Sequence, residues 1–314
     1  MSDLKNNFSI VICTYNRSPL LKLCLNSLVK TENKHACIEI IVIDNNSKDN
    51  TKEVVNEYIK EYPAWTIKYV FEKKQGLSIS RTTGYKNAKG LFIFYLDDDA
   101  QASANLLESI SKNINNYDLD IFTGPIYPFY LKEKPVWFKD SYEIRTMGTD
   151  TLKLEKGKEN VWGSNFGIKK ELLDKTSGFD ENMGMKAETI SYGEEHQILE
   201  EIKKIKQDLI VYYFPNSFVY HYVPQNKIKL SYFIEKYFKT GYFGMLVWKE
   251  KKSFSKNIFE IYLILRIPLL VIYCFLFRNK KRYPYYQNYL IENVLPLLCY
   301  VGEHYAKMVC FFKK

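Results

Sequence analysis

Three consecutive carboxylates, Asp97, Asp98 and Asp99, follow the apolar run LFIFYL. Adjacent negative charges at the end of a buried strand are costly unless another group compensates them. Carboxylates in this position can bind a divalent cation, which in turn bridges two phosphates. A solvated loop that caps the next helix is the alternative. The triplet is therefore a candidate metal and phosphate site.

Two further acids, Glu194 and Glu195, follow Gly193 at the start of a predicted helix, and His221 ends an apolar strand. Acidic residues in a first turn can simply favour the helix dipole. One of them could instead be the general base that removes a proton from an attacking hydroxyl. His221 is either a metal or phosphate ligand or a buried structural histidine.

Other polar side chains also stand where apolar runs end. Asp44 ends the run IEIIVI and could accept a hydrogen bond from a nucleobase or a ribose, or form a turn in Asp-Asn-Asn-Ser. Arg81 lies on a predicted helix that begins near these strand ends, and its guanidinium could contact a pyrophosphate. The first apolar run is followed by three more polar residues: Thr14, Tyr15 and Asn16.

The elements that must position these residues alternate between strand and helix. Apolar, β-branched runs predict strands at 9–14, 38–43, 67–71 and 91–96, and helical spacing predicts helices at 20–30, 51–61 and 77–88. This alternation predicts a mostly parallel sheet flanked by helices, an α/β fold. Ligands of such sheets bind beyond the carboxyl ends of the strands, where the polar residues stand.

Past residue 100 the pattern is looser. It predicts a strand and turn in 120–130, a strand crossing the site in 160–169, a helix at 193–206 and an apolar stretch at 209–222. Near residue 226 the sequence changes to basic, amphipathic helices. We therefore predict two domains, 1–225 and 226–314.

Seven segments resemble, in order, the family 2 inverting glycosyltransferases, which have the GT-A fold. They are SIVICTYNR, IIVIDNNSKDNT, QGLSISRTTGYKNAKG, FYLDDDA, WGSNFGIKKELLDKTSGFDENM, GEEHQI and YHYVPQNKIKLSYFIEKYFKTG. The resemblance covers about residues 8–244. It implies nucleotide-sugar binding in 1–100 and an acceptor side in 101–225. Two positions depart from the family pattern, with Ser80 for the usual Ala and Thr82 for the usual Asn.

The resemblance also implies a role for each candidate residue. The nucleoside and donor would be held by Thr14, Tyr15, Asn16, Asp44, Arg81, Asp97 and Asp98. The acceptor side would include Trp162, Gly163 and Asn165. Asp99, with Asp97 and His221, would bind Mn²⁺ or Mg²⁺. Glu195 stands at the position of the family's catalytic Asp, and its longer side chain leaves Glu194 as the alternative base.

The resemblance further implies which reaction the chain performs. It predicts inverting, metal-dependent transfer from a nucleotide sugar, with UDP-sugar as the first expectation, to a glycan or lipid-linked glycan in surface polysaccharide biosynthesis. The Gln-x-x-Arg-Trp motif of processive members does not follow Gln197, which favours addition of one sugar. The alternatives are a nucleotidyltransferase, disfavoured because CTYNRSPLL is not a Gly-rich phosphate loop, and a non-catalytic nucleotide-sugar-binding protein.

Charge is concentrated at the C-terminal end. The whole chain has a net charge of +9, and residues 226–314 contain 16 Lys and Arg against 5 Asp and Glu. Basic clusters beside long apolar runs favour anionic lipid over nucleic acid as the partner. The 20-residue run 258–277 is interrupted by Glu260, Arg266 and Pro268. We predict helices that lie in the membrane interface, with a true span and a soluble helical bundle or homodimer contact as alternatives.

The compartment follows from two simpler features. The first seven residues are polar and do not resemble a secretory signal. The six cysteines have no CxxC spacing, which is typical of small core residues in a reducing compartment. We therefore predict a cytoplasmic protein, peripherally associated with the inner face of the cell membrane.

Overall fold

The structure is a computed structural model that describes residues 8–31, 38–157, 159, 161–181, 193–248 and 254–312. The chain forms two compact units, one from Met1–Phe129 and Glu143–Tyr222 and the other from Tyr130–Tyr142 and Val223–Lys314. Segment 130–142, which the sequence placed in the first domain, groups with the C-terminal helices. The domain boundary at residue 225 stays a prediction.

Unit 1 is built on an eight-stranded sheet of order β3-β2-β1-β4-β9-β6-β10-β8. Its strands are β1 (Phe8–Thr14), β2 (Ile38–Asp44), β3 (Thr66–Phe71), β4 (Phe92–Tyr95), β6 (Ile121–Thr123), β8 (Leu152–Lys153), β9 (Phe166–Lys169) and β10 (Val211–Tyr213). Neighbouring strands from β3 to β4 are parallel, as are β6 and β10, whereas β9 runs antiparallel to β4 and β6. The predicted α/β class with a mostly parallel sheet is confirmed.

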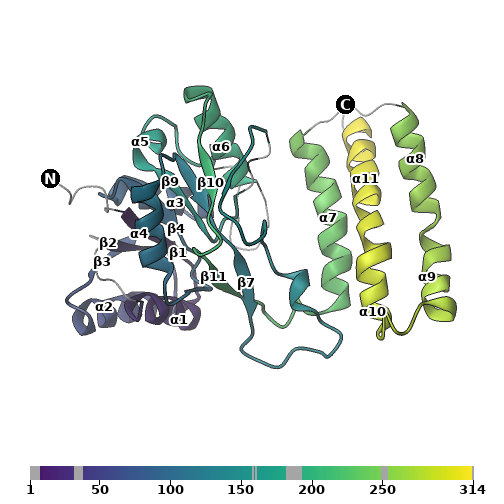
Figure 1. Cartoon of the computed structure of the whole chain (residues 1–314), viewed down its shortest axis with the longest axis horizontal. Helices are drawn as coiled ribbons and strands as arrows, with labels where there is room; N and C mark the ends of the chain where they lie inside the picture. Colours follow the sequence, from purple (N-terminus) through teal and green to yellow (C-terminus); the bar gives the residue numbers. More distant parts are fainter. Residues whose placement is uncertain are drawn as a thin grey trace. The chain divides into compact units, whose positions relative to one another are not determined.

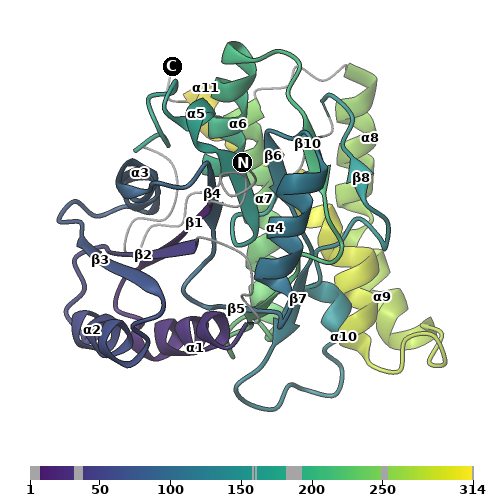
Figure 2. The ribbon, with the colours of Figure 1, turned by 60° about the vertical axis from the view of Figure 1, so that its left-hand side comes forward.

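Helices cover both faces of this sheet (Figures 1 and 2). On one face α1 (Ser18–Val29), α2 (Thr51–Glu61) and α4 (Leu106–Asn116) pack on every second residue of β1, including Ile10 and Ile12. On the other, α3 (Leu77–Asn87), α5 (Lys170–Leu173) and α6 (Glu194–Ile205) pack with Val11, Ile41 and Ile93. Alternate residues point to opposite faces, so a strand buried on both sides is apolar throughout.

The later part of unit 1 differs from the sequence expectation. Residues 120–130 form two strands in different sheets, because β7 (Ile126–Phe129) pairs with β11 (Val219–Tyr222) beside β5 (Ala100–Ala102) in a three-stranded sheet. The strand predicted at 160–169 is confined to β9, and Trp162 to Asn165 form a tight bridge instead. The small sheet matters for the site, since β5 follows the acidic triplet directly and pairs with β11.

Unit 2 is helical, as predicted for the C-terminal region. Its helices are η1 (Asp140–Tyr142), α7 (Leu230–Trp248), α8 (Phe254–Leu265), α9 (Ile267–Phe277), α10 (Tyr286–Tyr289), the π-helix η2 (Leu290–Val294), η3 (Leu295–Leu297) and α11 (Leu298–Phe312). Glycines let α7 and α11 pack closely, since a Cβ at Gly241 would lie 1.8 Å from the Cys299 carbonyl oxygen. The segment 130–142 joins this unit through Phe138 in its core and Lys139, which pairs with Glu292.

Candidate active site

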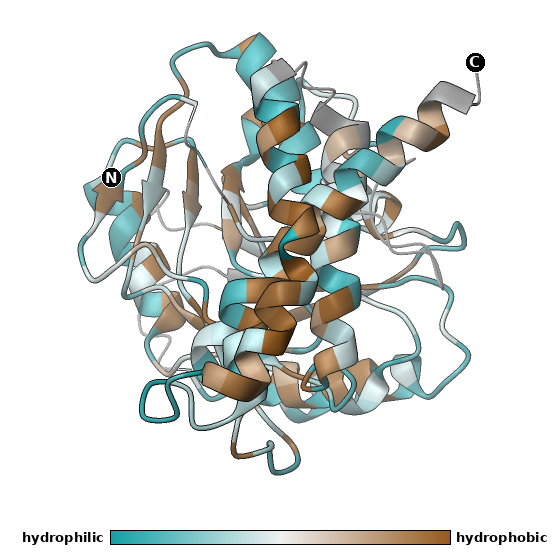
Figure 3. Ribbon diagram, turned by 90° about the vertical axis from the view of Figure 1, so that its right-hand side faces the viewer, coloured by the Kyte–Doolittle hydropathy of each residue, from teal (hydrophilic) through white to brown (hydrophobic). Residues whose placement is uncertain are grey.

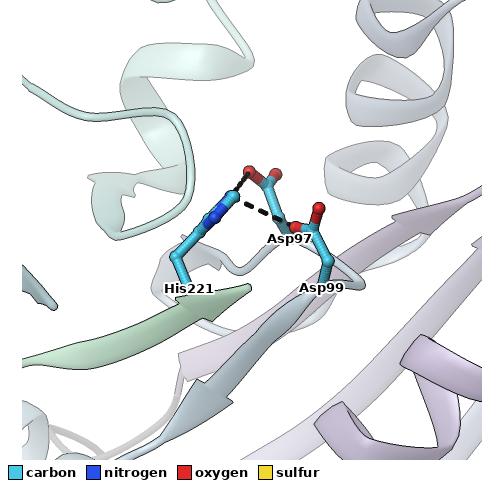
Figure 4. Close-up of side chains that lie close together, drawn as sticks. All are labelled: Asp97, Asp99 and His221. Atoms are coloured by element: carbon cyan, nitrogen blue, oxygen red, sulfur yellow. Dashed lines mark ion pairs between the residues drawn. The ribbon is translucent and has the colours of Figure 1, made fainter. Parts of the chain in front are cut away.

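Asp97, Asp99 and His221 converge on one point in unit 1 (Figure 4). His221 Nε2 lies 3.2 Å from Asp99 Oδ1 and 3.7 Å from Asp97 Oδ2. Strand pairing produces this approach, because His221 on β11 is opposite Ala100 on β5 and the Tyr222 amide donates to the Asp99 carbonyl at 2.9 Å. His221, more than 120 positions from the two aspartates in sequence, is therefore their neighbour in space.

The donor atoms of this trio fit a divalent cation. One ligand atom from each residue lies within 4.8 Å of the others. His221 Nδ1 is 3.1 Å from the Tyr222 carbonyl oxygen, which can only accept, so Nδ1 carries a proton, and loss of the proton on Nε2 would leave a lone pair there for a metal. Carboxylate oxygens and an imidazole nitrogen are ordinary ligands of divalent metals in proteins.

Asp98 points away from this trio and toward β1. It accepts a hydrogen bond from Thr14 Oγ1 at 2.7 Å and pairs with Arg17 at 3.3 Å, and Arg17 also reaches Asp99 at 3.2 Å. Burial, together with the charge of Asp99, raises the pKa of Asp98 to about 7. Burial opposes ionisation of Asp97 too, but the hydrogen bond from His221 and the charge of Arg81 outweigh it and lower its pKa.

Arg81 is the buried centre of the site, with a side chain only 3 % exposed. Its guanidinium lies 3.2 Å from Glu194, 3.0 Å from Glu195 and 3.6 Å from Asp97. It also donates to the Gly163 carbonyl at 3.2 Å. Aromatic faces complete the pocket around it, with ring centroids 5.6 to 5.9 Å away in Tyr95, Phe166 and Phe179. One cation thus holds together three carboxylates, one from the loop after β4 and two from α6.

The two acids at the start of α6 differ in their surroundings. Gly193, with φ +108°, turns the chain into the helix, a conformation that favours glycine. The Glu194 side chain is 7 % exposed and that of Glu195 is 21 % exposed. Burial and the charge of Glu195 raise the pKa of Glu194 to about 7. Glu195 is therefore the carboxylate that a ligand reaches more easily.

The predicted nucleoside residues lie at the ends of β1 and β2, and several of their polar atoms have partners within the protein. Asp44 accepts from the Ser47 amide at 2.8 Å and from Tyr69 Oη at 2.7 Å, so it forms the turn that the sequence left as an alternative. Asn16 adopts φ +52° and accepts from the Lys48 amide at 2.6 Å. Tyr15, between Thr14 and Asn16, is partly exposed. Their contact with a nucleoside stays a prediction.

The predicted acceptor residues divide into two kinds. Trp162 and Gly163 are partly exposed, and a Cβ at Gly163 would lie 1.9 Å from Glu195 Oε1, so a larger residue there would displace that carboxylate. Asn165 is fully buried, and its amide nitrogen donates to the Pro125 and Ser217 carbonyls at 2.9 Å each. Asn165 thus links the connection between β6 and β7 to the connection between β10 and β11. Its contact with an acceptor stays untested.

Two residues of this site were not singled out from the sequence. Arg17 ends the segment CTYNR. Its charge within an otherwise uncharged turn is the sequence feature that could have identified it as a site residue. Asn45 follows Asp44, and its side chain accepts from the Gly76 amide at 2.8 Å while donating to the Lys74 carbonyl at 2.7 Å. It thereby fixes the start of α3, the helix that supplies Arg81. Asn, which is common in turns, offers no local signal for such a long-range contact.

Known proteins with similar sequences or structures include several glycosyltransferases. The glucosyl-dolichyl phosphate glucuronosyltransferase of Haloferax volcanii is 20 % identical over 276 residues, which are 84 % of this chain and 86 % of that protein. The first three curated relatives are matched over a smaller part, since the chain spans 20 %, 36 % and 38 % of their length.

Solved structures share the fold. A mannosyltransferase from Pyrobaculum calidifontis, in complex with GDP-Man and Mn²⁺, has a TM-score of 0.58 at 14 % identity, over 98 % of this chain and 76 % of that one. TarS of S. aureus, residues 1–349 with UDP-GlcNAc, has a TM-score of 0.57 at 16 % identity, over 96 % and 87 % of the two chains. At these identities the likeness establishes the fold, which is GT-A.

The family follows from the sequence itself. The sequence model described as glycosyl transferase family 2 matches residues 9–177, more than half of the chain. The match contains β1 to β4, Arg81, the acidic triplet and Gly163. This chain belongs to glycosyl transferase family 2.

Proposed function

We propose that this chain catalyses an inverting, metal-dependent transfer of one sugar from a nucleotide sugar, first among them a UDP-sugar, to a hydroxyl of a glycan or lipid-linked glycan in surface polysaccharide biosynthesis. One observation carries the proposal. Arg81 contacts both Asp97 of the metal trio and the acids of α6. The Arg81 side chain thus connects the proposed general base on α6 to Asp97, a proposed ligand of the metal that binds the diphosphate.

Each residue then has a defined task. Glu195 accepts the proton of the acceptor hydroxyl while that oxygen forms its bond to the anomeric carbon. The bond from this carbon to the diphosphate oxygen breaks, and the electron pair leaves with the nucleoside diphosphate. Mn²⁺ or Mg²⁺ held by Asp97, Asp99 and His221 would neutralise charge on that leaving group. Arg81 keeps Glu195 in place, and Gly163 leaves the carboxylate accessible.

Similar proteins support the substrate classes. The Haloferax relative is named for a dolichyl-phosphate-linked substrate, which favours a lipid-linked acceptor here. TarS binds UDP-GlcNAc, and the Pyrobaculum enzyme binds GDP-Man with Mn²⁺, which favours a nucleotide sugar and a divalent metal. A lipid-linked acceptor also agrees with the proposed location, at the inner face of the cell membrane, reached peripherally through the basic C-terminal region. A homodimer contact through the same region is the competing arrangement.

Turnover on a donor panel tests the proposal. The full chain is incubated with UDP-, GDP- and dTDP-sugars, with Mn²⁺ or with EDTA, and released nucleoside diphosphate is measured. We expect release from one donor class, only with the metal. Asp99→Ala should lose metal-dependent donor binding in calorimetric titration while it keeps the melting temperature. Equal turnover in EDTA, or unchanged metal-dependent affinity in Asp99→Ala, would contradict the metal assignment.

A further inference from the structure

The rod formed by α8 and α9 exposes a long apolar surface. Among the described residues, 11 of the 25 large hydrophobic side chains that are exposed lie between Ile258 and Phe277. Leu265, Leu269 and Leu276 are 70 %, 67 % and 67 % exposed. We call the exposed side chains of 258–277 the outer face. A soluble monomer rarely exposes so large a contiguous apolar patch without a partner.

The opposite side of the rod carries its polar groups inward. Glu260 is 2 % exposed, and its carboxylate lies 3.4 Å from His304 Nε2 on α11. One turn earlier, Asn257 Oδ1 accepts a hydrogen bond from Lys307 at 3.1 Å. The inward positions recur every three or four residues, up to the fully buried Cys274. Apolar residues such as Ile267 and Leu270 face the interior of this unit beside the acid, while leucine and phenylalanine also face outward, where a water-soluble helix is polar.

Cations flank the outer face. Lys256 precedes it, and Arg278 followed by Lys280, Lys281 and Arg282 ends it. Of the basic cluster 249–256 predicted from the sequence, residues 249–253 lie outside the described residues. Midway, the exposed Arg266 separates α8 from α9, and its guanidinium lies 5.6 Å from the Tyr262 ring. Among the described residues of 254–282 the one carboxylate is the buried Glu260, so the exposed charge pattern there is complementary to anionic headgroups rather than to a second copy.

We propose that the outer face of α8 and α9 enters the outer hydrocarbon of an anionic phospholipid bilayer, with the rod lying along the interface. The inference rests on the proposed membrane association and names the residues that carry it. The segment 255–277 has 23 residues, and only 11 % of its 18-residue apolar window is buried. Arg266, halfway along, would lie in the hydrocarbon centre of a span, but a rod in the interface lets it reach the headgroups. Figure 3 shows hydrophobic colouring along the helices of unit 2.

Substitutions on the outer face separate apolar insertion from attraction by charge alone. Leu265→Asn, Leu269→Asn and Leu276→Asn are combined in the full chain. The matched control combines Leu91→Asn, Leu131→Asn and Val136→Asn, three exposed apolar residues elsewhere. Both are sedimented with vesicles of phosphatidylcholine and phosphatidylglycerol, at low and high salt. We expect the outer-face variant to lose about a hundredfold or more in partitioning, since three apolar side chains no longer insert.

Salt dependence and oligomeric state distinguish apolar insertion from attraction by charge and from self-association. Wild type and control should bind alike and keep much of their binding at high salt, because apolar insertion is not screened. Wild-type-like vesicle binding by the outer-face variant overturns the proposal. So does a change from dimer to monomer in that variant with vesicle binding retained, which assigns the face to self-association. Nucleotide-sugar binding and the melting temperature, measured without vesicles, report on folding and on the proposed transfer function separately.

Discussion

The two units place charge and apolar surface in opposite ways. In unit 1 the apolar side chains fill two layers around the sheet, and the ionisable groups crowd at the carboxyl ends of β1 and β4. In unit 2 the rod of α8 and α9 turns Glu260 inward and its leucines outward. Exposure to water accounts for the first arrangement, and the proposed contact with lipid would account for the second.

Buried charged residues have different roles in the two units. Unit 1 keeps Arg81, Asp98 and Glu194 close to like and unlike charges, and the raised pKa of both acids shows that this crowding is costly. Such perturbed groups gather at sites where chemistry occurs. Glu260 lies beside His304 on α11 and links α8 to that helix. We therefore expect substitutions of charged residues to change reactivity in unit 1 and stability in unit 2.

Glu195→Gln should produce the largest change. Loss of the general base should lower kcat by about 10²- to 10⁴-fold, while the dissociation constant of the nucleotide sugar stays close to that of wild type. Steady-state kinetics and calorimetry on the same preparations measure both. A larger loss in Glu194→Gln would reassign the base within the pair.

Glu260→Ala tests the opposite behaviour in unit 2. The change leaves His304 without this carboxylate in a largely buried place, so we expect unfolding to become easier by about 1–3 kcal/mol. Denaturation followed by circular dichroism measures the loss, with Glu235→Ala, whose side chain is 60 % exposed, as the control. Donor affinity should stay the same, and a drop in donor affinity without a drop in stability would break the contrast between the units.

Arg17→Gln sharpens the account of the metal trio. The guanidinium now neutralises Asp98 and Asp99, so its removal should tighten Mn²⁺ binding by about threefold to tenfold, the effect of one unit charge near a surface site. Electron paramagnetic resonance of free Mn²⁺ gives the affinity without turnover. Weaker binding in the variant would mean instead that Arg17 orients Asp99 for the metal.

Glu194→Gln should have the smallest effect, and it depends on pH. The folded pKa is about 7 and the ordinary value is 4.5, so the folded chain holds a proton between these values that the unfolded chain releases. Stability of the wild type should therefore fall as pH rises from about 4.5 to about 7. The variant lacks this fall and should be more stable by on the order of 1 kcal/mol at pH 8. Parallel denaturation curves at pH 5 and pH 8 would contradict the assignment.

Much of unit 1 was predictable because its early elements follow local rules. The helix at 51–61 was predicted at its observed bounds, and the strands ending at Thr14, Asp44 and Leu96 lie within a residue or two of the observed ends. Buried parallel strands produce continuous apolar runs, and the chain must turn where they stop. The candidates Asp97, Asp99 and His221 were recognisable for the same reason, since charge at the end of such a run is unusual.

The sequence alone thus determined the α/β class, the family resemblance and the residue types of the site, because each depends on spacing within one segment. Tertiary structure decided which groups meet. Arg81 and Glu194 are 113 positions apart, and Arg17 and Asp98 are 81 apart. The sequence likewise does not determine that Glu260 points inward. Periodicity distinguishes the two sides of a helix, but only packing against α11 decides which side is buried. Contacts of this kind depend on where whole elements lie, and no local pattern of residues encodes that.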